Sequence, residues 1–186
     1  MRIIAGKFRG RKLAAPVNHD IRPTTDRIRE SMFAILGSRY PDLLTGTRIL
    51  DLFAGTGALG LEALSRGARF SLFVENSSQG YGLVRKNIEN LGAKSQTKSL
   101  RADATRLGPI GIIEPFDLVF ADPPYGKNLA EKAVNCLVEG GWLSPQAIVV
   151  IEDNAVNPPP ILPTCNILDE RKFGDTKIWI AKPEQR

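Results

Sequence analysis

The chain has 186 residues, is 42% hydrophobic and carries a net charge of +5. This size favours one domain with a full hydrophobic core, and no apolar run approaches the roughly 20 residues of a membrane-spanning helix. The first residues lack the long apolar stretch of a signal peptide, so we expect a cytoplasmic protein. His19 is the only histidine, and Cys136 and Cys165 are the only cysteines. This supply of ligands argues against a metal site and a disulfide, and we expect neither.

The positive charge is concentrated in one segment. Residues 1–40 carry nine basic and three acidic side chains, whereas the remaining residues carry 16 basic and 17 acidic ones. Because a cationic segment on an otherwise balanced chain favours a polyanionic partner, we expect a nucleic acid to dock here. A solvated basic tail without a partner is the alternative.

A hairpin of two short strands is predicted at the N-terminus. Residues 2–5 and 11–15 would form the strands, and residues 6–10 the turn between them. Phe8 lies among basic residues of this turn, where it could stack on a base; packing onto the core is the alternative. We therefore divide the chain into a nucleic-acid-docking hairpin with its linker, residues 1–22, and a main domain, residues 23–186.

The segment after Pro23 predicts a helix. A threonine at 24 or 25 can cap its first turn, and Gly37 would end it. Apolar residues recur at helical spacing and should face the core: Ile28, Met32, Ile35 and Leu36. Arg27 and Arg29 lie off this stripe, so they would face solvent or a phosphate backbone.

From residue 48 onward, strand-like and helix-like patterns alternate. The predicted strands are residues 48–53, 70–75, a short stretch near 100, 116–121 and 147–151. Helices are predicted at residues 59–66, 77–91 and 129–138, and a closing hairpin at residues 166–171 and 177–181. This alternation is typical of an α/β fold with a parallel sheet covered by helices.

A glycine-rich motif follows the first of these strands. Gly55-Thr56-Gly57-Ala58-Leu59-Gly60 matches G-x-G-x-x-G, whose glycines let the backbone approach a ligand at a helix N-terminus. Glu75 ends the next strand, 24 residues after Asp51, and an acid at this spacing can hold ribose hydroxyls. Asp51 would repel a pyrophosphate but suits an ammonium, and Asp103 could face an adenine amino group. An ammonium, a ribose and an adenine without phosphate describe S-adenosylmethionine, which we expect as the cofactor.

A second motif, Asp122-Pro123-Pro124-Tyr125, follows the predicted strand at 116–121. The Asp122 carboxylate and the Pro123 carbonyl can accept hydrogen bonds from an exocyclic amino group, which localises the lone pair of its nitrogen. The prolines stiffen the loop, and Tyr125 can stack on a base. Positioning would supply most of the acceleration, and a carboxylate with a pKa near ~4 could take up the released proton. The motif therefore indicates methyl transfer to the amino group of a base.

These motifs resemble those of known families. Asp-Pro-Pro-Tyr resembles the signature of amino-group N-methyltransferases that act on adenine, cytosine or guanine. The longer stretch 51–67, together with residues 2–4, 9–13 and 22–30, resembles the bacterial guanine-N2 methyltransferases of 16S ribosomal RNA. This resemblance runs from Arg2 to about Ala181, which is nearly the whole chain.

The resemblance implies a Rossmann-like sheet of seven strands in which the last strand is antiparallel. It implies S-adenosylmethionine as the methyl donor, with S-adenosylhomocysteine as product, and a monomeric enzyme. Asp51 and the glycines would line the methionine end of the donor, Glu75 would hold the ribose, and Asp103 the adenine. The residues expected at the donor are Asp51, Phe53, Ala54, Gly55, Thr56, Gly57, Glu75, Asn76, Asp103 and Ala104.

The resemblance also implies a guanine that is flipped out of 16S ribosomal RNA in the assembled 30S subunit. The catalytic residues expected around this base are Asp122, Pro123, Pro124 and Tyr125. The residues expected to contact RNA are Arg2, Lys7, Phe8, Arg9, Arg11, Lys12, Arg22, Arg27 and Arg29.

Three alternatives remain open on the sequence alone. The tetrapeptide also fits an adenine-N6 methyltransferase of RNA or DNA, although 186 residues leave no room for a sizeable DNA-recognition domain. A non-enzymatic RNA-binding module would not need Asp122 for its function. A nicotinamide oxidoreductase would use the glycine motif for a dinucleotide.

Overall fold

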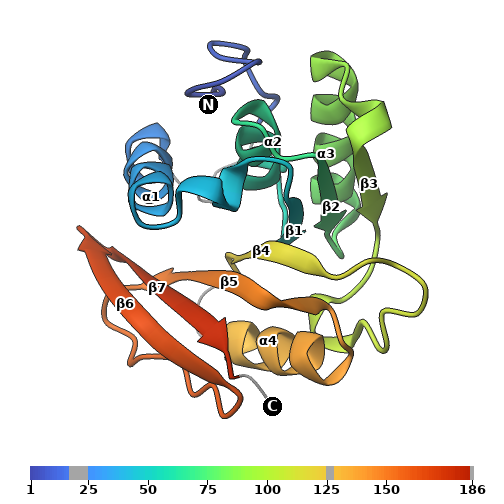
Figure 1. Cartoon of the computed structure of the whole chain (residues 1–186). Helices are drawn as coiled ribbons and strands as arrows, with labels where there is room; N and C mark the ends of the chain where they lie inside the picture. The colour runs from blue at the N-terminus through green and yellow to red at the C-terminus, as the bar shows by residue number, and fades with distance from the viewer. Residues whose placement is uncertain (17–24, 125–127, 185–186) are drawn as a thin grey trace.

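The computed structural model describes residues 1–16, 25–124 and 128–184. Within these residues, seven strands form one sheet in the order β3-β2-β1-β4-β5-β7-β6 (Figure 1). The strands are β1 (Arg48–Leu52), β2 (Phe70–Val74), β3 (Thr97–Leu100), β4 (Phe116–Ala121), β5 (Leu143–Asn154), β6 (Cys165–Phe173) and β7 (Thr176–Pro183). The first five strands are parallel, and β7 is antiparallel to both β5 and β6. The predicted α/β class and seven-stranded Rossmann-like sheet are therefore confirmed.

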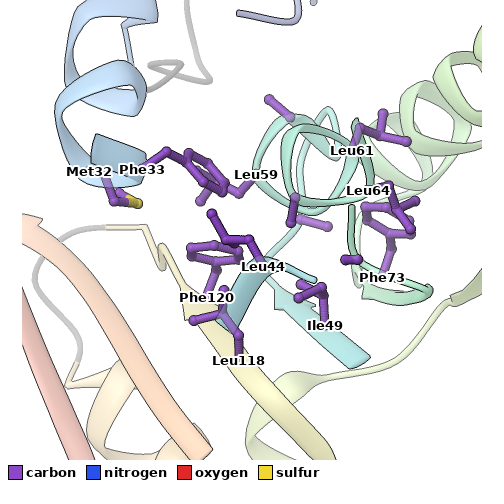
Figure 2. Packing of buried hydrophobic residues seen from close by; sticks show 14 of the residues in the cluster. Met32, Phe33, Leu44, Ile49, Leu59, Leu61, Leu64, Phe73, Leu118 and Phe120 are labelled. Carbon is purple, nitrogen blue, oxygen red and sulfur yellow. The ribbon is translucent and has the colours of Figure 1, made fainter. Parts of the chain in front are cut away.

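Helices cover both faces of this sheet (Figure 1). The helices are α1 (Asp26–Arg39), α2 (Ala58–Ser65), α3 (Ser78–Leu91) and α4 (Leu129–Glu139). The first three share one hydrophobic core, in which Phe33 of α1 packs against Phe120 of β4 with ring centroids 5.6 Å apart (Figure 2). α4 packs on the opposite face, where Phe116 stacks on Trp142. The central strands β1, β2 and β4 are thus buried on both sides, as expected of parallel strands, whereas the edge strands β3 and β6 are largely exposed.

α1 begins as predicted but ends later. The Thr25 side chain accepts a hydrogen bond from the Ile28 N–H and so caps the first turn. The predicted end at Gly37 is wrong, because the helix continues through it to Arg39. The helix stops just before Pro41, which disfavours a helical conformation at the preceding residue.

The carboxyl ends of the central strands meet at one edge of the sheet. Leu52 at the end of β1 pairs with Val74 on one side and with Ala121 on the other. Val74 in turn pairs with Leu100 at the end of β3. The loops after β1, β2, β3 and β4 therefore leave the sheet side by side, which is where open α/β sheets bind ligands.

Residues 1–16, here called the N-terminal segment, reverse direction but form no pair of strands. Arg2 and Lys12 make one antiparallel bridge, and the Ile3 N–H donates to the Arg11 carbonyl. The predicted turn is therefore confirmed, whereas the two predicted strands are wrong. The two arms pair only briefly, because the remaining backbone bonds across the turn are those from the Gly10 N–H to the Ile3 carbonyl and from the Leu13 N–H to the Met1 carbonyl, while the Ile3 and Leu13 side chains pack in the core. The proposed domain boundary between residues 22 and 23 lies outside the described residues.

Candidate functional site

The glycine motif forms the turn that connects β1 to α2. Gly55 and Gly57 have φ angles of 55° and 75°, a left-handed conformation that favours glycine. Gly60 lets α2 approach β2, because a Cβ there would lie 2.5 Å from Cε1 of Phe73. Phe53 also has a positive φ, 56°, which the sequence did not reveal. The result is a tight turn whose glycines are required by its positive φ angles and by the close packing of α2 on Phe73.

Asp51 lies beneath this turn rather than at its surface. Its side chain is 2% exposed, and Oδ2 accepts a hydrogen bond of 2.9 Å from the Gly60 N–H. Burial raises the pKa of this carboxyl to about 8, against the lowering effect of the Gly60 bond, and the nearby Glu75 charge adds to the rise. Asp51 therefore ties the end of β1 to the first turn of α2. Its contact with a donor ammonium remains a prediction.

Asp51→Asn is expected to change how stability depends on pH. Between the ordinary pKa of 3.8 and the folded value of about 8, the unfolded carboxyl loses its proton while the buried one keeps it. This group should therefore lower the free energy of unfolding as pH rises through that window, by up to about 1.4 kcal/mol per pH unit. The variant lacks this loss and should gain stability relative to the native protein. Urea unfolding of both proteins at about pH 5 and about pH 8 measures the difference between their free energies of unfolding. The same difference at both pH values would contradict the expectation.

Glu75 connects the glycine turn to the start of α3. Its Oε2 accepts from the Gly55 N–H at 2.9 Å, and its Oε1 accepts from the Ser77 N–H at 2.8 Å. The structure thus brings Glu75 to the same turn as Asp51, as predicted for residues around one ligand. Asn76, which follows it, is exposed at this edge. The ribose-binding role of Glu75 remains a prediction.

Asp103 and Ala104 lie beyond the end of β3, at the start of a short 3₁₀ helix, Ala104–Arg106. The Asp103 carboxylate accepts hydrogen bonds from the N–H and the hydroxyl of Thr105, which lower its pKa. Asp103 is therefore an ionised, exposed acceptor at the edge of the sheet that also carries Glu75. Ala104 is buried beneath it. A contact with adenine is consistent with this position and stays a prediction.

The second motif begins where β4 ends. Asp122 is partly buried, Pro123 is buried and Pro124 is exposed. Since β4 lies next to β1 in register, Asp122 follows a residue paired with Leu52, only a few residues before the glycine turn. The structure therefore brings the two motifs together at one edge. Tyr125 lies outside the described residues.

A cavity of about 220 Å³ lies beside the two prolines. Pro123, Ile151 and Trp179 contribute apolar walls, and Asp153 and Asn157 contribute polar groups. The Asp153 Oδ1 accepts a hydrogen bond of 2.8 Å from the Asn157 side chain. Neither polar residue was predicted from the sequence, although Asp153 lies near the end of a strand adjacent to β4, which is a usable signal. A flat heterocycle next to Asp122 would have such a mixed lining.

Several predicted RNA contacts lie at the surface. The exposed cations of the N-terminal segment are Arg2, Lys7, Arg9, Arg11 and Lys12. Arg27 of α1 is exposed as well and lines a cleft of about 330 Å³ with Arg2 and Arg9. We call these six exposed cations together the basic face, although Asp26 and Glu30 also line the cleft. Arg22 lies outside the described residues.

Two residues predicted to contact RNA are buried instead. Phe8 is 7% exposed and packs in the core with Ile3 and Leu13, so its prediction as a base-stacking residue is wrong. Arg29 is fully buried, and its prediction as a phosphate contact is wrong too. The Arg29 guanidinium donates to the Arg2 carbonyl and to Asp26 Oδ1, so it fastens the N-terminal segment to α1. Both residues therefore help to pack the N-terminal segment onto the rest of the protein instead of contacting solvent.

Two features are absent from the described part of the chain. Among the helices in those residues, none has the length and apolar character that crossing a membrane requires. No group of three or more histidine, cysteine, aspartate or glutamate side chains is placed to hold a metal ion within the same ranges.

Comparison with known proteins gives concordant matches. A protein-family model described as "Conserved hypothetical protein 95" matches residues 1–182. Ribosomal RNA small subunit methyltransferase D of Escherichia coli strain K12 is 37% identical over 163 residues, which cover 88% of this chain and 79% of that protein. The protein of the same name from Haemophilus influenzae is 34% identical over 180 residues, with coverage of 94% and 89%.

Solved structures agree with this match. The Escherichia coli protein yhhF superposes with a TM-score of 0.85 at 32% identity, covering 100% of this chain and 99% of that one. The glycine turn, the acids around it and the fold fit S-adenosylmethionine, which is the methyl donor of this enzyme class. The chain therefore belongs to the family of the ribosomal RNA small subunit methyltransferases D, and it is an S-adenosylmethionine-dependent methyltransferase.

Proposed function

We propose that this enzyme methylates the exocyclic N2 amino group of a guanine in 16S ribosomal RNA. The observation that carries the proposal is the position of Asp122 and Pro123 at the end of β4, beside the glycine turn. The names of the relatives support the RNA substrate, since those proteins are called small-subunit ribosomal RNA methyltransferases. The likeness of the motifs to guanine-N2 enzymes supports the choice of amine.

The chemistry depends on how the chain holds the amine. Bound S-adenosylmethionine supplies an electrophilic methyl group on a sulfonium, so the site needs no separate activation of the methyl. The amine is a poor nucleophile because its lone pair is delocalised into the purine. The Asp122 carboxylate and the Pro123 carbonyl accept hydrogen bonds from its two N–H groups and so direct the lone pair toward the donor. After transfer, Asp122 is the carboxylate placed to receive the proton.

The base must leave its stack to reach Asp122. The cavity beside Pro123 has apolar walls and polar groups, which suit a flipped base. Tyr125 would stack on this base, with Pro124 stiffening the loop before it. The basic face would hold the flanking phosphates, because guanidinium and ammonium groups bind a backbone irrespective of its sequence. The substrate would be the assembled 30S subunit in the cytoplasm, and the enzyme would act as a monomer.

A labelled-methyl transfer assay tests the proposal. Unmethylated 30S particles and protein-free 16S RNA are incubated with the enzyme and labelled donor, and the nucleosides are then analysed. Label in N2-methylguanosine from particles is the expected result. Label in N6-methyladenosine would keep the chemistry and overturn the proposed base. Absence of label from both substrates, with donor binding intact, would contradict the proposed reaction.

The basic face should carry an electrostatic share of RNA binding. Replacing Lys7, Arg9 and Arg11 together by alanine should weaken binding and flatten its dependence on salt. The slope of log affinity against log salt should fall by about one for each phosphate that the variant no longer neutralises. Replacing Lys132 of α4 and Lys172 of β6, two exposed cations outside this face, is the control. An unchanged slope in the triple variant would remove the N-terminal segment from the RNA interface.

A further inference from the structure

Asn87 is a buried polar residue of α3 that the chemistry described above does not use. Its side chain is fully buried. Its Oδ1 accepts a hydrogen bond of 2.7 Å from the Ala14 N–H. Its Nδ2 donates to the Ala14 carbonyl at 3.0 Å and to the Thr56 carbonyl at 2.9 Å. One amide thus joins two segments that lie far apart in the sequence.

These contacts fix the amide in one orientation. Both carbonyls require an N–H donor, and the Ala14 N–H requires an acceptor, so a flipped side chain would lose all three bonds. Ala14 belongs to the N-terminal segment, which also carries five of the exposed cations of the basic face. Thr56 lies between Gly55 and Gly57 of the glycine turn, here called the donor turn because the donor is expected to bind there. Asn87 therefore contacts the segment proposed to bind RNA and the turn that binds the donor.

Other contacts hold the N-terminal segment without reaching the donor turn backbone. The buried carboxylate of Glu62 accepts from the N–H groups of Ile4 and Ala5. The Ser65 hydroxyl accepts from the Phe8 N–H at 2.9 Å. Both residues belong to α2, and neither bonds to Thr56, whose hydroxyl makes a separate, weaker contact of 3.4 Å with Met1 Sδ. Among these anchors, the Asn87 side chain is the one that divides its hydrogen bonds between the segment and the turn.

We propose that Asn87 is a positioning residue that couples the donor turn to the N-terminal segment. Ordering of the turn around a donor fixes the Thr56 carbonyl, which fixes the amide and therefore Ala14. Linkage makes the effect reciprocal, so that ordering of the segment tightens donor binding. The further consequence, that RNA and donor bind cooperatively, rests on the proposed function, whereas the coupling between segment and turn does not.

Hydrogen exchange with and without S-adenosylhomocysteine tests the coupling directly. In the native protein, this ligand should slow the exchange of amides in residues 3–14, although the ligand site lies at the turn. In Asn87→Ala the slowing should disappear, and the affinity for S-adenosylhomocysteine should fall roughly tenfold, the size expected for one or two hydrogen bonds. Asn87→Asp is the second variant, to be used if Asn87→Ala does not fold. It keeps the shape of the side chain and the acceptor for the Ala14 N–H but loses the donor to the Thr56 carbonyl, so it should show the same losses.

Ser65→Ala is the matched control. It removes an anchor of the same segment but leaves the bond between Asn87 and Thr56 in place. Its N-terminal amides should exchange faster than those of the native protein, yet the ligand should bind with native affinity and still slow them. The proposal is overturned if the Asn87 variants behave in the same way as Ser65→Ala. Because the readout needs no RNA, its failure is distinct from a failure to methylate guanine.

Discussion

Asp122→Asn is expected to lower methyl transfer by about a hundredfold or more while leaving donor affinity nearly unchanged. Asparagine has almost the same shape as aspartate, but its amide lacks the negative charge that strengthens the hydrogen bond proposed between Asp122 and the target amine. It also cannot accept the proton that the methylated amine releases. The glycine turn and Glu75 do not depend on this side chain for their hydrogen bonds, so S-adenosylhomocysteine should bind as before.

Single-turnover methyl transfer and titration with S-adenosylhomocysteine separate the two effects. Asp175→Asn makes the same chemical change on an exposed carboxylate in the turn between β6 and β7, and it should transfer methyl groups at the native rate. A variant at Asp122 that keeps native turnover would remove the carboxylate from the chemistry. A loss of donor affinity as large as the loss of turnover would instead place Asp122 at the donor.

The sequence was sufficient for features that depend on local patterns. The strand predicted at residues 116–121 is β4 with the same ends, because a continuous apolar run followed by Asp122-Pro123 leaves little choice. The helix predicted at residues 77–91 is α3, Ser78–Leu91, because Ser77 caps its first turn and Gly92 takes the left-handed conformation at its end. The site could be located for the same reason, as both motifs follow apolar strands directly.

The sequence was insufficient where an apolar pattern allows two phases of a helix. The predicted stripe of α1 contained Ile28 and Ile35, which are only half-buried, whereas Arg29 is buried on the same helical face as Phe33 and Leu36. The Arg29 guanidinium can lie there because it donates to Asp26 Oδ1 and to the Arg2 carbonyl. The prediction for Phe8 failed because its surroundings in the sequence are basic whereas its surroundings in space are apolar. Asn87 carried no local signal, since its three partners come from two distant segments.

Gly6→Ala should be the most destabilising change in the N-terminal segment. Gly6 has a φ of 79°, and a Cβ there would lie 1.8 Å from the Ser65 carbonyl oxygen. That oxygen accepts a hydrogen bond of 2.7 Å from the Lys7 N–H, so neither backbone can move away without breaking the contact. The turn must lift from α2, which also withdraws Phe8 from the core. We expect a loss of more than about 3 kcal/mol in the free energy of unfolding.

Gly10→Ala separates the clash from the backbone strain. Gly10 has nearly the same φ, 80°, but a Cβ at this position would have no atom within 4 Å, because it would point to the open side of the turn. The free energy of unfolding of this variant should fall by only about 1–2 kcal/mol, which is the cost of holding alanine in the left-handed conformation. Urea unfolding compares the two, and equal losses would show that packing of the turn on Ser65 contributes nothing. Because the same turn carries Lys7 and Arg9, Gly6→Ala should also weaken RNA binding without removing a charge. Weaker RNA binding by Gly6→Ala would mean that RNA affinity depends on where α2 holds the basic face as well as on its charges.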